Sequence, residues 1–277
     1  MTGAAAGDPQ LPLRDTVAIV TGAGGLLGRE HAAALWAAGA HVVLADTTSV
    51  AGEEAADTMV DGIGALMVAA VDVTNAESLV ALRDQVIERF GRIDVLVNNA
   101  AINDKVEDWD PAADEPDVMN YPIDAWRHVL DVNVTGVFLS SQIFGASMVG
   151  AASGSIINIA STYALVGPDP SLYERPDGRR DFLKSPAYPT SKAAVIGLTR
   201  YLATAWGAHG VRVNALAPGG VENGQEPFFV ERYASRTPLG RMAAPADYHG
   251  AIVFLASDAS RYMTGATLVV DGGFTAW

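Results

Sequence analysis

The chain has 277 residues, 49% of them hydrophobic, and carries a formal net charge of −14. This length suits a single doubly wound α/β domain with a large core, and the negative charge would repel nucleic-acid phosphates and anionic membranes over most of the surface. The absence of cysteine excludes a disulfide framework, a thiolate nucleophile and a cysteine-based zinc site, and it agrees with a cytoplasmic location.

Residues 1–10 have neither the basic nor the apolar region of a signal peptide, so we expect residues 1–13 to form a short flexible lead before one domain over 14–277. The sequence contains no run of about 18 uninterrupted apolar residues, and we therefore expect no membrane span. The five histidines show no ligand spacing, so no metal site is predicted.

The first predicted strand, 16–20, is a short apolar run without polar alternation, as expected for a strand buried on both faces of a parallel sheet. A glycine-rich turn follows over 21–28, then a helical pattern over 29–38 that ends at Gly39, and a second apolar strand over 41–45. Such a βαβ unit places backbone N–H groups where they can approach a pyrophosphate. A tight turn without a ligand is the alternative.

Asp46 closes the second predicted strand, 18 residues beyond Gly28 (46 − 28 = 18). A carboxylate at this place can accept hydrogen bonds from both ribose hydroxyls of NAD, and it would repel the 2′-phosphate of NADP. The strand before the turn, the helix after it and the acid at this spacing together favour an NAD site over a turn without a ligand.

Strands and helices continue to alternate to the end of the chain. Further strands are expected at 65–71, 93–97, 155–160, 211–216 and 267–270, and further helices at 76–90, 121–149, 186–206 and 245–257. The sequence therefore predicts an α/β fold with a doubly wound parallel sheet of about seven strands and helices on both faces. Ligands of such sheets bind outside the carboxyl ends of the strands, where polar side chains recur in this chain.

Tyr188 and Lys192 are four residues apart at the start of the predicted helix 186–206, so they face the same way. An ammonium beside a phenol favours phenolate, and we expect Lys192 to lower the pKa of Tyr188 from about 10 toward neutrality. Taken alone, the pair is more typical of a packing tyrosine and a solvated lysine. Pro189 disfavours helical dihedrals at Tyr188, which places the tyrosine in the first turn of the helix.

Several short motifs occur together in a fixed order. They are the glycine turn, Asp46, Asp72-Val73, Asn98-Asn99-Ala100, Asn133, Ser161, Tyr188 with Lys192, Pro218-Gly219, Tyr262-Met263-Thr264-Gly265 and Val270-Asp271-Gly272-Gly273. With these motifs, from about residue 14 to its end, the chain resembles the short-chain dehydrogenase/reductase family. The resemblance implies a Rossmann-type sheet, NAD(H) as co-substrate, and the interconversion of an alcohol and a carbonyl compound.

The resemblance also implies a role for each matching residue. Tyr188 would be the general acid/base, and Lys192 would lower its pKa and bind the nicotinamide ribose. Ser161 would donate to the substrate oxygen, and Asn133 would support a proton relay that reaches Lys192. The implied cofactor-binding residues are Gly22, Gly25, Leu27, Gly28, Asp46, Asp72, Val73, Asn99, Ala100, Tyr188, Lys192, Pro218 and Val221. Outside this pattern, Ser161 and Asn133 are each more typical of structural roles.

The chain departs from the family pattern in four places. Leu26 stands where glycine is common in the turn, Ala101 follows Asn-Asn-Ala in place of glycine, and Asn223 replaces a threonine that would contact the pyrophosphate. The largest departure separates Ser161 from Tyr188 by 27 positions (188 − 161 = 27), more than is usual in the family.

Three loops, at about 103–120, 162–185 and 219–240, are expected to wall the substrate pocket. The first is strongly acidic, and the second carries aromatic and basic side chains: Tyr163, Tyr173, Phe182, Arg175, Arg179, Arg180 and Lys184. These two loops could form salt bridges and close as a lid, with a solvated loop face as the alternative. A sub-group of the family associated with cell-surface sugar biosynthesis is similar in this insertion, which suggests a polar, sugar-like substrate.

We therefore predict an NAD(H)-dependent oxidoreductase that interconverts a secondary alcohol and a ketone of a small-molecule substrate. The alternative is a dinucleotide-binding sensor or scaffold of the same fold without turnover, which would have no use for a phenol at the carbonyl. The resemblance also implies a homo-oligomer, a tetramer or a dimer. The terminal Phe274 and Trp277 favour an oligomer, because a monomer would gain little by exposing them.

Overall fold

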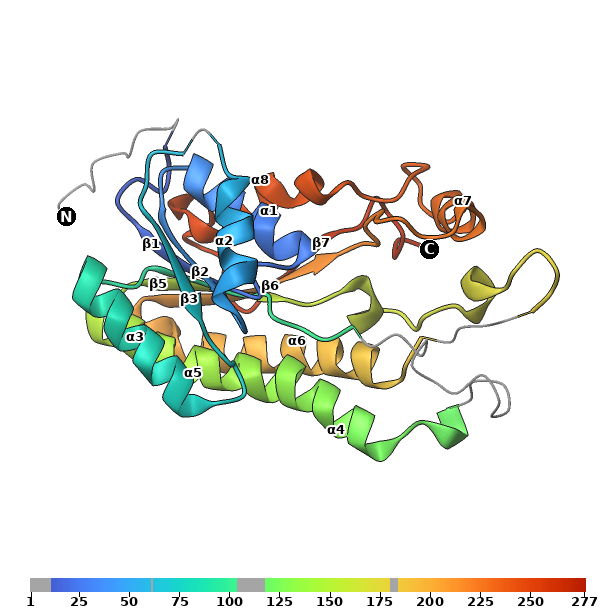
Figure 1. Cartoon of the computed structure of the whole chain (residues 1–277), viewed down its shortest axis with the longest axis horizontal. Coiled ribbons are helices and arrows are strands. Elements are labelled where there is room, and N and C mark those ends of the chain that lie inside the picture. The colour runs from blue at the N-terminus through green and yellow to red at the C-terminus, as the bar shows by residue number, and fades with distance from the viewer. Residues whose placement is uncertain (1–10, 61, 104–117, 180–183) are drawn as a thin grey trace.

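The computed structural model describes residues 11–60, 62–103, 118–179 and 184–277 (Figure 1). Within these ranges the chain forms one seven-stranded parallel sheet with helices on both faces, which confirms the predicted fold class. The strand order is β3-β2-β1-β4-β5-β6-β7. The chain therefore reverses its direction of winding between β1 and β4, and ligands of such sheets bind in the crevice at that point.

The strands agree with the apolar runs of the sequence to within about two residues. They are β1 (Val17–Thr21), β2 (His41–Asp46), β3 (Leu66–Ala70), β4 (Val95–Asn98), β5 (Gly154–Ile159), β6 (Val211–Pro218) and β7 (Thr267–Val270). Every neighbouring pair is parallel. All seven carboxyl ends consequently lie along one edge of the sheet.

The helices form a layer on each face of the sheet (Figure 1). One face carries α1 (Leu26–Ala37), α2 (Ser49–Asp57) and α8 (His249–Ala256), and the other carries α3 (Ala76–Phe90), α4 (Ile123–Leu130), α5 (Val137–Ala151) and α6 (Ala187–Trp206). α7 (Pro227–Ser235) lies beyond the carboxyl ends of the strands, on the right in Figure 1. It therefore stands over the place where a ligand would bind.

Alternate residues of β1 point into different cores. Ala18 and Val20 belong to the core under α1 and α8, while Val17 and Ile19 belong to the core under α3 and α5. All four side chains are buried. Burial on both faces explains why the strands show continuous apolar runs with no polar alternation.

The predicted helix 121–149 contains an irregular turn. α4 and α5 are joined by a π-helical turn over Asp131–Gly136, and such turns are frequent at functional sites. By length and composition, Ile123–Ala151 is apolar enough to cross a membrane. It packs against α3, α6 and β5, however, as the core helix of a Rossmann-type domain does.

The structure corrects the predicted element boundaries in three places. Leu13 is buried in the core and its N–H donates to the carbonyl of Ala38 (3.0 Å), so the flexible lead predicted for 1–13 ends too late. The segment 219–240, expected as a loop, contains α7 with Pro227 in its first turn. The unpredicted α2 begins after Thr48, whose hydroxyl caps the helix.

The acidic side chains of the loop predicted at 103–120 lie outside the described residues, as do Arg180 and Phe182 of the second loop. The predicted lid depends on these side chains, so it also lies outside the described residues.

Candidate active site

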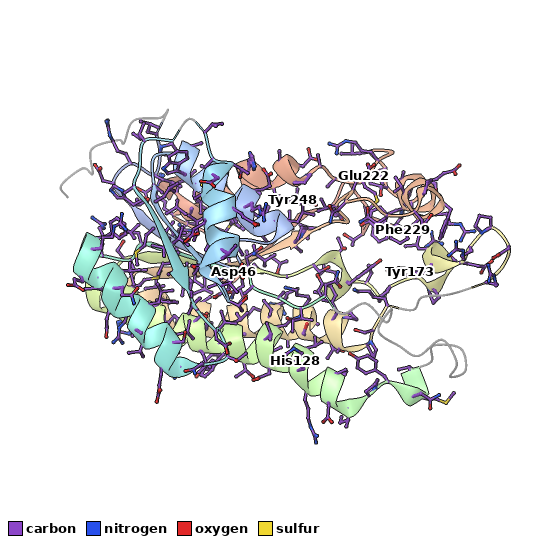
Figure 2. All side chains as sticks on the ribbon, viewed as in Figure 1. Asp46, His128, Tyr173, Glu222, Phe229 and Tyr248 are labelled. Atoms are coloured by element: carbon purple, nitrogen blue, oxygen red, sulfur yellow. The ribbon has the colours of Figure 1, made fainter. Side chains whose placement is uncertain are left out.

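A cleft with a cavity volume of about 1390 Å³ runs along the carboxyl ends of the strands. All the predicted site residues except Asn133 line it, and they come from strand ends, from the turn after β1 and from the start of α6. In Figure 2, Asp46 lies to the left of Tyr173 and Phe229, which belong to the other half of the same cleft. Residues spread over the whole sequence are thus brought to one site.

The turn after β1 has no room for a side chain at Gly22 or at Gly28. A Cβ atom at Gly22 would lie 2.7 Å from Cα of Ala100, and one at Gly28 would lie 2.0 Å from the carbonyl oxygen of Gly22. α1 begins directly after Gly25 and has no side-chain cap, so N–H groups at this helix end remain for an anion. Leu26 is partly exposed at the first helical position, where it leaves the turn open.

Thr21 and Asn99 hold this turn against the end of β4. Nδ2 of Asn99 donates to the carbonyl oxygens of Thr21 and Gly22, each over 3.0 Å. The Thr21 hydroxyl accepts from the N–H groups of Asn99 and Ala100, each over 3.1 Å. Thr21 has no role in the sequence prediction, although a hydroxyl directly before a glycine turn is a usable signal for such backbone bonding.

Asp46 is fixed at the edge of the cleft by the glycine turn. One carboxylate oxygen accepts from the N–H of Gly24 (2.8 Å) and the other from the N–H of Thr47 (2.7 Å). Asp72 lies at the same end of the cleft and accepts from the N–H of Thr74 (2.9 Å). The basic residues of the described lining come from other segments: Arg175, Lys184 and Lys192. Asp46 and Asp72 thus give this end of the cleft two carboxylates, while the Arg29 guanidinium donates to the carbonyl oxygen of Gly24 (2.7 Å).

Ser161, Tyr188 and Lys192 meet where β5 ends and α6 begins. The Ser161 hydroxyl and the Tyr188 phenol both line the cleft, and the serine hydroxyl is close enough to act against the rise in the pKa of the phenol. Nζ of Lys192 donates to the carbonyl oxygen of Ile159 (2.7 Å) and lies 5.7 Å from the centre of the Tyr188 ring. Nζ of Lys184 lies 4.5 Å from the same centre. Tyr188 is the second residue of α6, which agrees with its expected place in the first turn.

The pKa of Tyr188 is raised in this structure, so the predicted lowering is wrong for the protein without a ligand. Burial disfavours phenolate more than the hydrogen bond from Ser161 favours it, although part of the ring still faces the cleft. Lys192 is itself buried, and burial lowers its pKa to about 8. The same desolvation therefore disfavours the charged form of Lys192, which was expected to stabilise the phenolate.

Asn133 lies behind the cleft, fully buried in the π-helical turn. Its Oδ1 accepts from the N–H of Ile102 (2.7 Å), and its Nδ2 donates to the carbonyl oxygen of Ile102 (2.9 Å) and to Oγ of Ser191 (3.0 Å). The amide is thus placed beside Ser191, the neighbour of Lys192 in the sequence, and it joins the segment after β4 to α6.

Aromatic side chains line the other half of the cleft. Two come from the segment between Ser161 and Tyr188 and three come from α7: Tyr163, Tyr173, Phe228, Phe229 and Tyr233. The ring centroids of Tyr173 and Phe229 are 5.3 Å apart. The α7 residues are absent from the sequence prediction, but Phe229 and Tyr233, four residues apart after Pro227, carried a helical signal.

A short chain dehydrogenase model matches residues 16–173, and an enoyl-(acyl carrier protein) reductase model matches residues 177–275. The chain belongs to the short-chain dehydrogenase/reductase family. A galactitol 2-dehydrogenase (L-tagatose-forming) of Cereibacter sphaeroides is 37% identical to this short-chain dehydrogenase over 94% of this chain and 95% of its own length. A cis-4-hydroxycyclohexanecarboxylate dehydrogenase of Sinomonas cyclohexanicum is also 37% identical, over 95% of this chain and 97% of its own length.

Solved structures of the family have the same fold. A gluconate 5-dehydrogenase from Burkholderia cenocepacia J2315, in complex with NADP and tartrate, superposes with a TM-score of 0.81 at 29% identity and covers 97% of this chain and 98% of its own. Family membership makes the protein an oxidoreductase that uses a nicotinamide dinucleotide and a small alcohol or carbonyl substrate. The residues fit such a cofactor, because the turn at Gly22 and Gly28 excludes Cβ atoms and an uncapped helix end follows it.

Proposed function

We propose that this short-chain dehydrogenase interconverts a polar secondary alcohol and its ketone with NAD(H), and that Tyr188 is the general acid/base. The observation that carries the proposal is the meeting of Ser161, Tyr188 and Lys192 in the same cleft as the glycine turn. The nicotinamide supplies the hydride donor or acceptor. The protein then has to hold the substrate oxygen and to move one proton.

Tyr188 would carry that proton. In reduction its hydroxyl protonates the carbonyl oxygen, and in oxidation its phenolate removes the proton from the alcohol. The raised pKa keeps the phenol protonated in the ligand-free protein, and a positive charge beside it would favour the phenolate that oxidation requires. Ser161 lines the same cleft as this phenol, so the substrate oxygen would meet two hydroxyl groups.

Lys192 and Asn133 would act around this centre. The family resemblance implies that the Lys192 ammonium would bind the nicotinamide ribose, and in this structure the ammonium donates to the carbonyl oxygen of Ile159 at the end of β5. The bonds of Asn133 to Ile102 and Ser191 hold the two walls of the cleft together. A relay of protons through Asn133 remains part of the proposal.

The preference for NAD over NADP rests on Asp46. Its carboxylate stays at the cleft edge through its bonds to the N–H groups of Gly24 and Thr47, in the position where a ribose would lie. A 2′-phosphate at this place would meet a negative charge that the turn holds in position. A family structure with bound NADP shows that the fold itself does not exclude a 2′-phosphate, so we attribute the preference to this side chain.

The substrate is proposed to be a polar, sugar-like secondary alcohol. The relatives named above act on galactitol and on a hydroxycyclohexanecarboxylate, which are both polar alcohols. In this chain the segments 162–185 and 219–240 would wall the substrate, and both contribute side chains to the cleft. Tyr163, Arg175 and Gln225 supply polar groups within this wall.

The test compares the native protein with Tyr188→Phe in NADH oxidation against a panel of ketones and in NAD reduction against the corresponding alcohols. We expect substrate-dependent turnover in the native protein and a loss of at least about 100-fold in the variant. Turnover that survives the substitution undiminished contradicts the mechanism. Cofactor binding without turnover of any compound would favour the alternative, a dinucleotide-binding sensor or scaffold.

We also propose a homo-oligomer, a tetramer or a dimer, built on α5, α6 and β7. Phe138, Tyr201 and Val269 project from these three elements, and each is exposed by more than a third. β7 is an edge strand of the described sheet, so a second copy could cover both the strand and these side chains. Sedimentation as a monomer at micromolar concentration would contradict this assembly.

A further inference from the structure

Two tyrosine hydroxyl groups face each other in the substrate half of the cleft. Tyr163 belongs to the short helix Thr162–Ala164, and Tyr173 ends the short helix Pro170–Tyr173. Their hydroxyl oxygens are 3.0 Å apart, and both residues line the cleft that contains Tyr188. Both tyrosines belong to the long segment between Ser161 and α6. The chemistry proposed for Tyr188 does not use their hydroxyl groups.

Tyr163 is fixed relative to the reacting centre. Its N–H donates to Oγ of Ser161 (3.1 Å), and the N–H of Ala164 donates to the carbonyl oxygen of Ser161 (3.0 Å). One short turn thus sets both the Ser161 hydroxyl and the Tyr163 phenol. A substrate held by Ser161 would always meet Tyr163 at the same separation.

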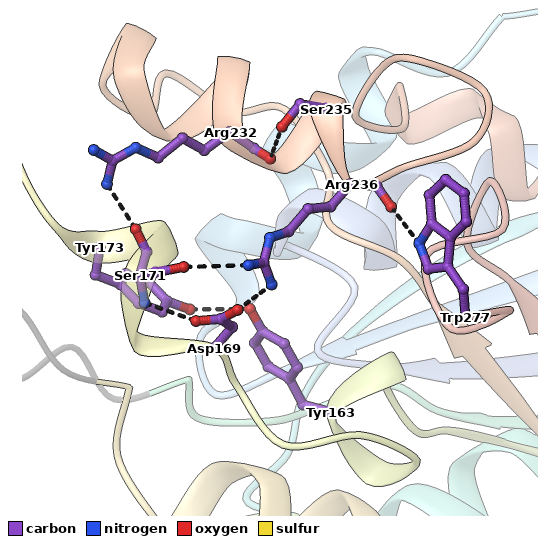
Figure 3. A network of polar contacts seen from close by, with 8 residues as sticks. All are labelled: Tyr163, Asp169, Ser171, Tyr173, Arg232, Ser235, Arg236 and Trp277. Carbon is purple, nitrogen blue, oxygen red and sulfur yellow. Dashed lines mark hydrogen bonds and ion pairs between the residues drawn. The ribbon is translucent and has the colours of Figure 1, made fainter.

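Tyr173 is fixed from the side of α7. The Arg232 guanidinium donates to the carbonyl oxygen of Ser171 over 2.6 Å (Figure 3). It also donates to the carbonyl oxygen of Glu174, on the other side of Tyr173 in the sequence. The Tyr173 ring packs on Phe229, with ring centroids 5.3 Å apart. Backbone and ring are therefore both held, and the phenol pair is preorganised for a ligand.

Both phenols stay protonated, because burial raises the pKa of Tyr163 and of Tyr173. A phenol hydroxyl can donate one hydrogen bond and accept others. The bond between the two tyrosines uses one of these capacities at Tyr163, and the other remains for a ligand in the cleft. A ligand hydroxyl suits this place whichever tyrosine donates, because it can itself donate or accept.

We propose that Tyr163 and Tyr173 form a subsite for a second hydroxyl group of the substrate, so that the enzyme selects diols and polyols, or hydroxyketones in reduction, over compounds with one oxygen function. The assignment rests on the proposed function, since the reacting carbon must lie at Tyr188. An analogue with a C–H group in this place leaves the second hydrogen-bonding capacity of the partly buried Tyr163 hydroxyl unused, and sites built to bind a hydroxyl group discriminate against such analogues.

The experiment measures kcat/KM with NAD for matched pairs: trans-1,2-cyclohexanediol against cyclohexanol, and meso-2,3-butanediol against 2-butanol. The proteins compared are the native enzyme, Tyr163→Phe, Tyr173→Phe and the control Tyr262→Phe, whose side chain is fully exposed. We expect the native enzyme and the control to prefer each diol by about tenfold or more. Tyr163→Phe should lower kcat/KM for the diols by about tenfold and leave the mono-alcohols within about twofold.

Equal preference for the diol in Tyr163→Phe and in the native enzyme overturns the subsite and leaves the dehydrogenase function intact. The same holds if the substitution lowers the rates of diols and mono-alcohols alike, since that is the mark of a structural defect. Thermal unfolding of each variant checks that it is folded. If the native enzyme oxidises none of these alcohols and reduces none of the matching ketones with either NAD or NADP, the proposed function fails and the subsite fails with it.

Discussion

The Lys192 ammonium donates to the carbonyl oxygen of Ile159 over 2.7 Å, in a place from which water is almost excluded. Burial lowers its pKa from 10.5 to about 8. At 1.36 kcal/mol per pKa unit, the charged lysine costs the folded state about 3 kcal/mol at neutral pH. The site is thus assembled at the expense of stability, as is common for functional groups.

Lys192→Met is therefore expected to abolish turnover and to raise the free energy of unfolding at pH 7 by about 1–3 kcal/mol, after about 1 kcal/mol is lost at the unpaired carbonyl of Ile159. Below pH 8 the native lysine is charged in both the folded and the unfolded state, so the whole cost is present. Between pH 8 and pH 10.5 the folded protein releases its proton first, and the advantage of the variant disappears.

Urea unfolding at pH 7 and pH 10 measures this difference. Arg83→Met is the matched control, because Arg83 is paired with its exposed neighbour Asp84, and we expect a change below about 0.5 kcal/mol at either pH. A Lys192→Met protein that is less stable than the native one at pH 7, with parallel pH dependence, would show that the buried charge carries no such cost.

Because His31 is buried in α1, we predict that the folded protein loses stability in acid. Burial, with a smaller contribution from His249, lowers its pKa from 6.5 to about 3. As the pH falls below 6.5 the unfolded chain binds the proton first, so the native state loses about 2 kcal/mol by pH 5. His31→Leu should remove this part of the pH dependence, as measured by urea unfolding at pH 7 and pH 5. The exposed His209→Leu serves as the control and should keep the native slope.

The sequence was sufficient for the sheet and for many of the residues that line its carboxyl edge, but not for the aromatic residues of α7. Strands such as β1 are buried on both faces, which leaves continuous apolar runs that a reader of the sequence can find. The direction of the Tyr188 pKa shift could not be predicted, because desolvation depends on the whole fold around the phenol. For the same reason the partners of Asn133 and the contact of Tyr173 with Phe229 appear only in three dimensions.

From the carboxylate of Asp46 we predict that the enzyme binds NADH more tightly than NADPH. Asp46→Asn keeps the shape of the side chain and one acceptor for the N–H of Gly24, while it removes the negative charge. We expect the ratio of the dissociation constants for NADPH and NADH to fall by about 10- to 100-fold, mainly through tighter binding of NADPH. Fluorescence titration of both reduced cofactors measures the ratio, with the exposed Asp84→Asn as the control. Tighter binding of NADPH than NADH by the native enzyme would contradict the assignment of NAD.

Arg232 connects α7 to the segment that carries Tyr173 (Figure 3). Arg232→Met keeps the apolar stem and removes both donors to the backbone carbonyls around Tyr173. We expect KM for the alcohol substrate to rise several-fold with kcat nearly unchanged, since the wall would be less ordered while Tyr188 stays in place. The free energy of unfolding should change by less than about 1 kcal/mol, because these bonds lie near the surface.

Steady-state kinetics gives kcat and KM for Arg232→Met and for the control Arg200→Met, whose arginine is exposed. The control separates the rise in KM from the effect of losing one positive charge. Arg236, which directly follows α7, forms an ion pair with Asp169 and so offers a second way to loosen the same wall. If Arg232→Met lowers kcat and leaves KM unchanged, the segment acts on the reacting centre itself. The view of α7 as a support for the substrate wall would then be wrong.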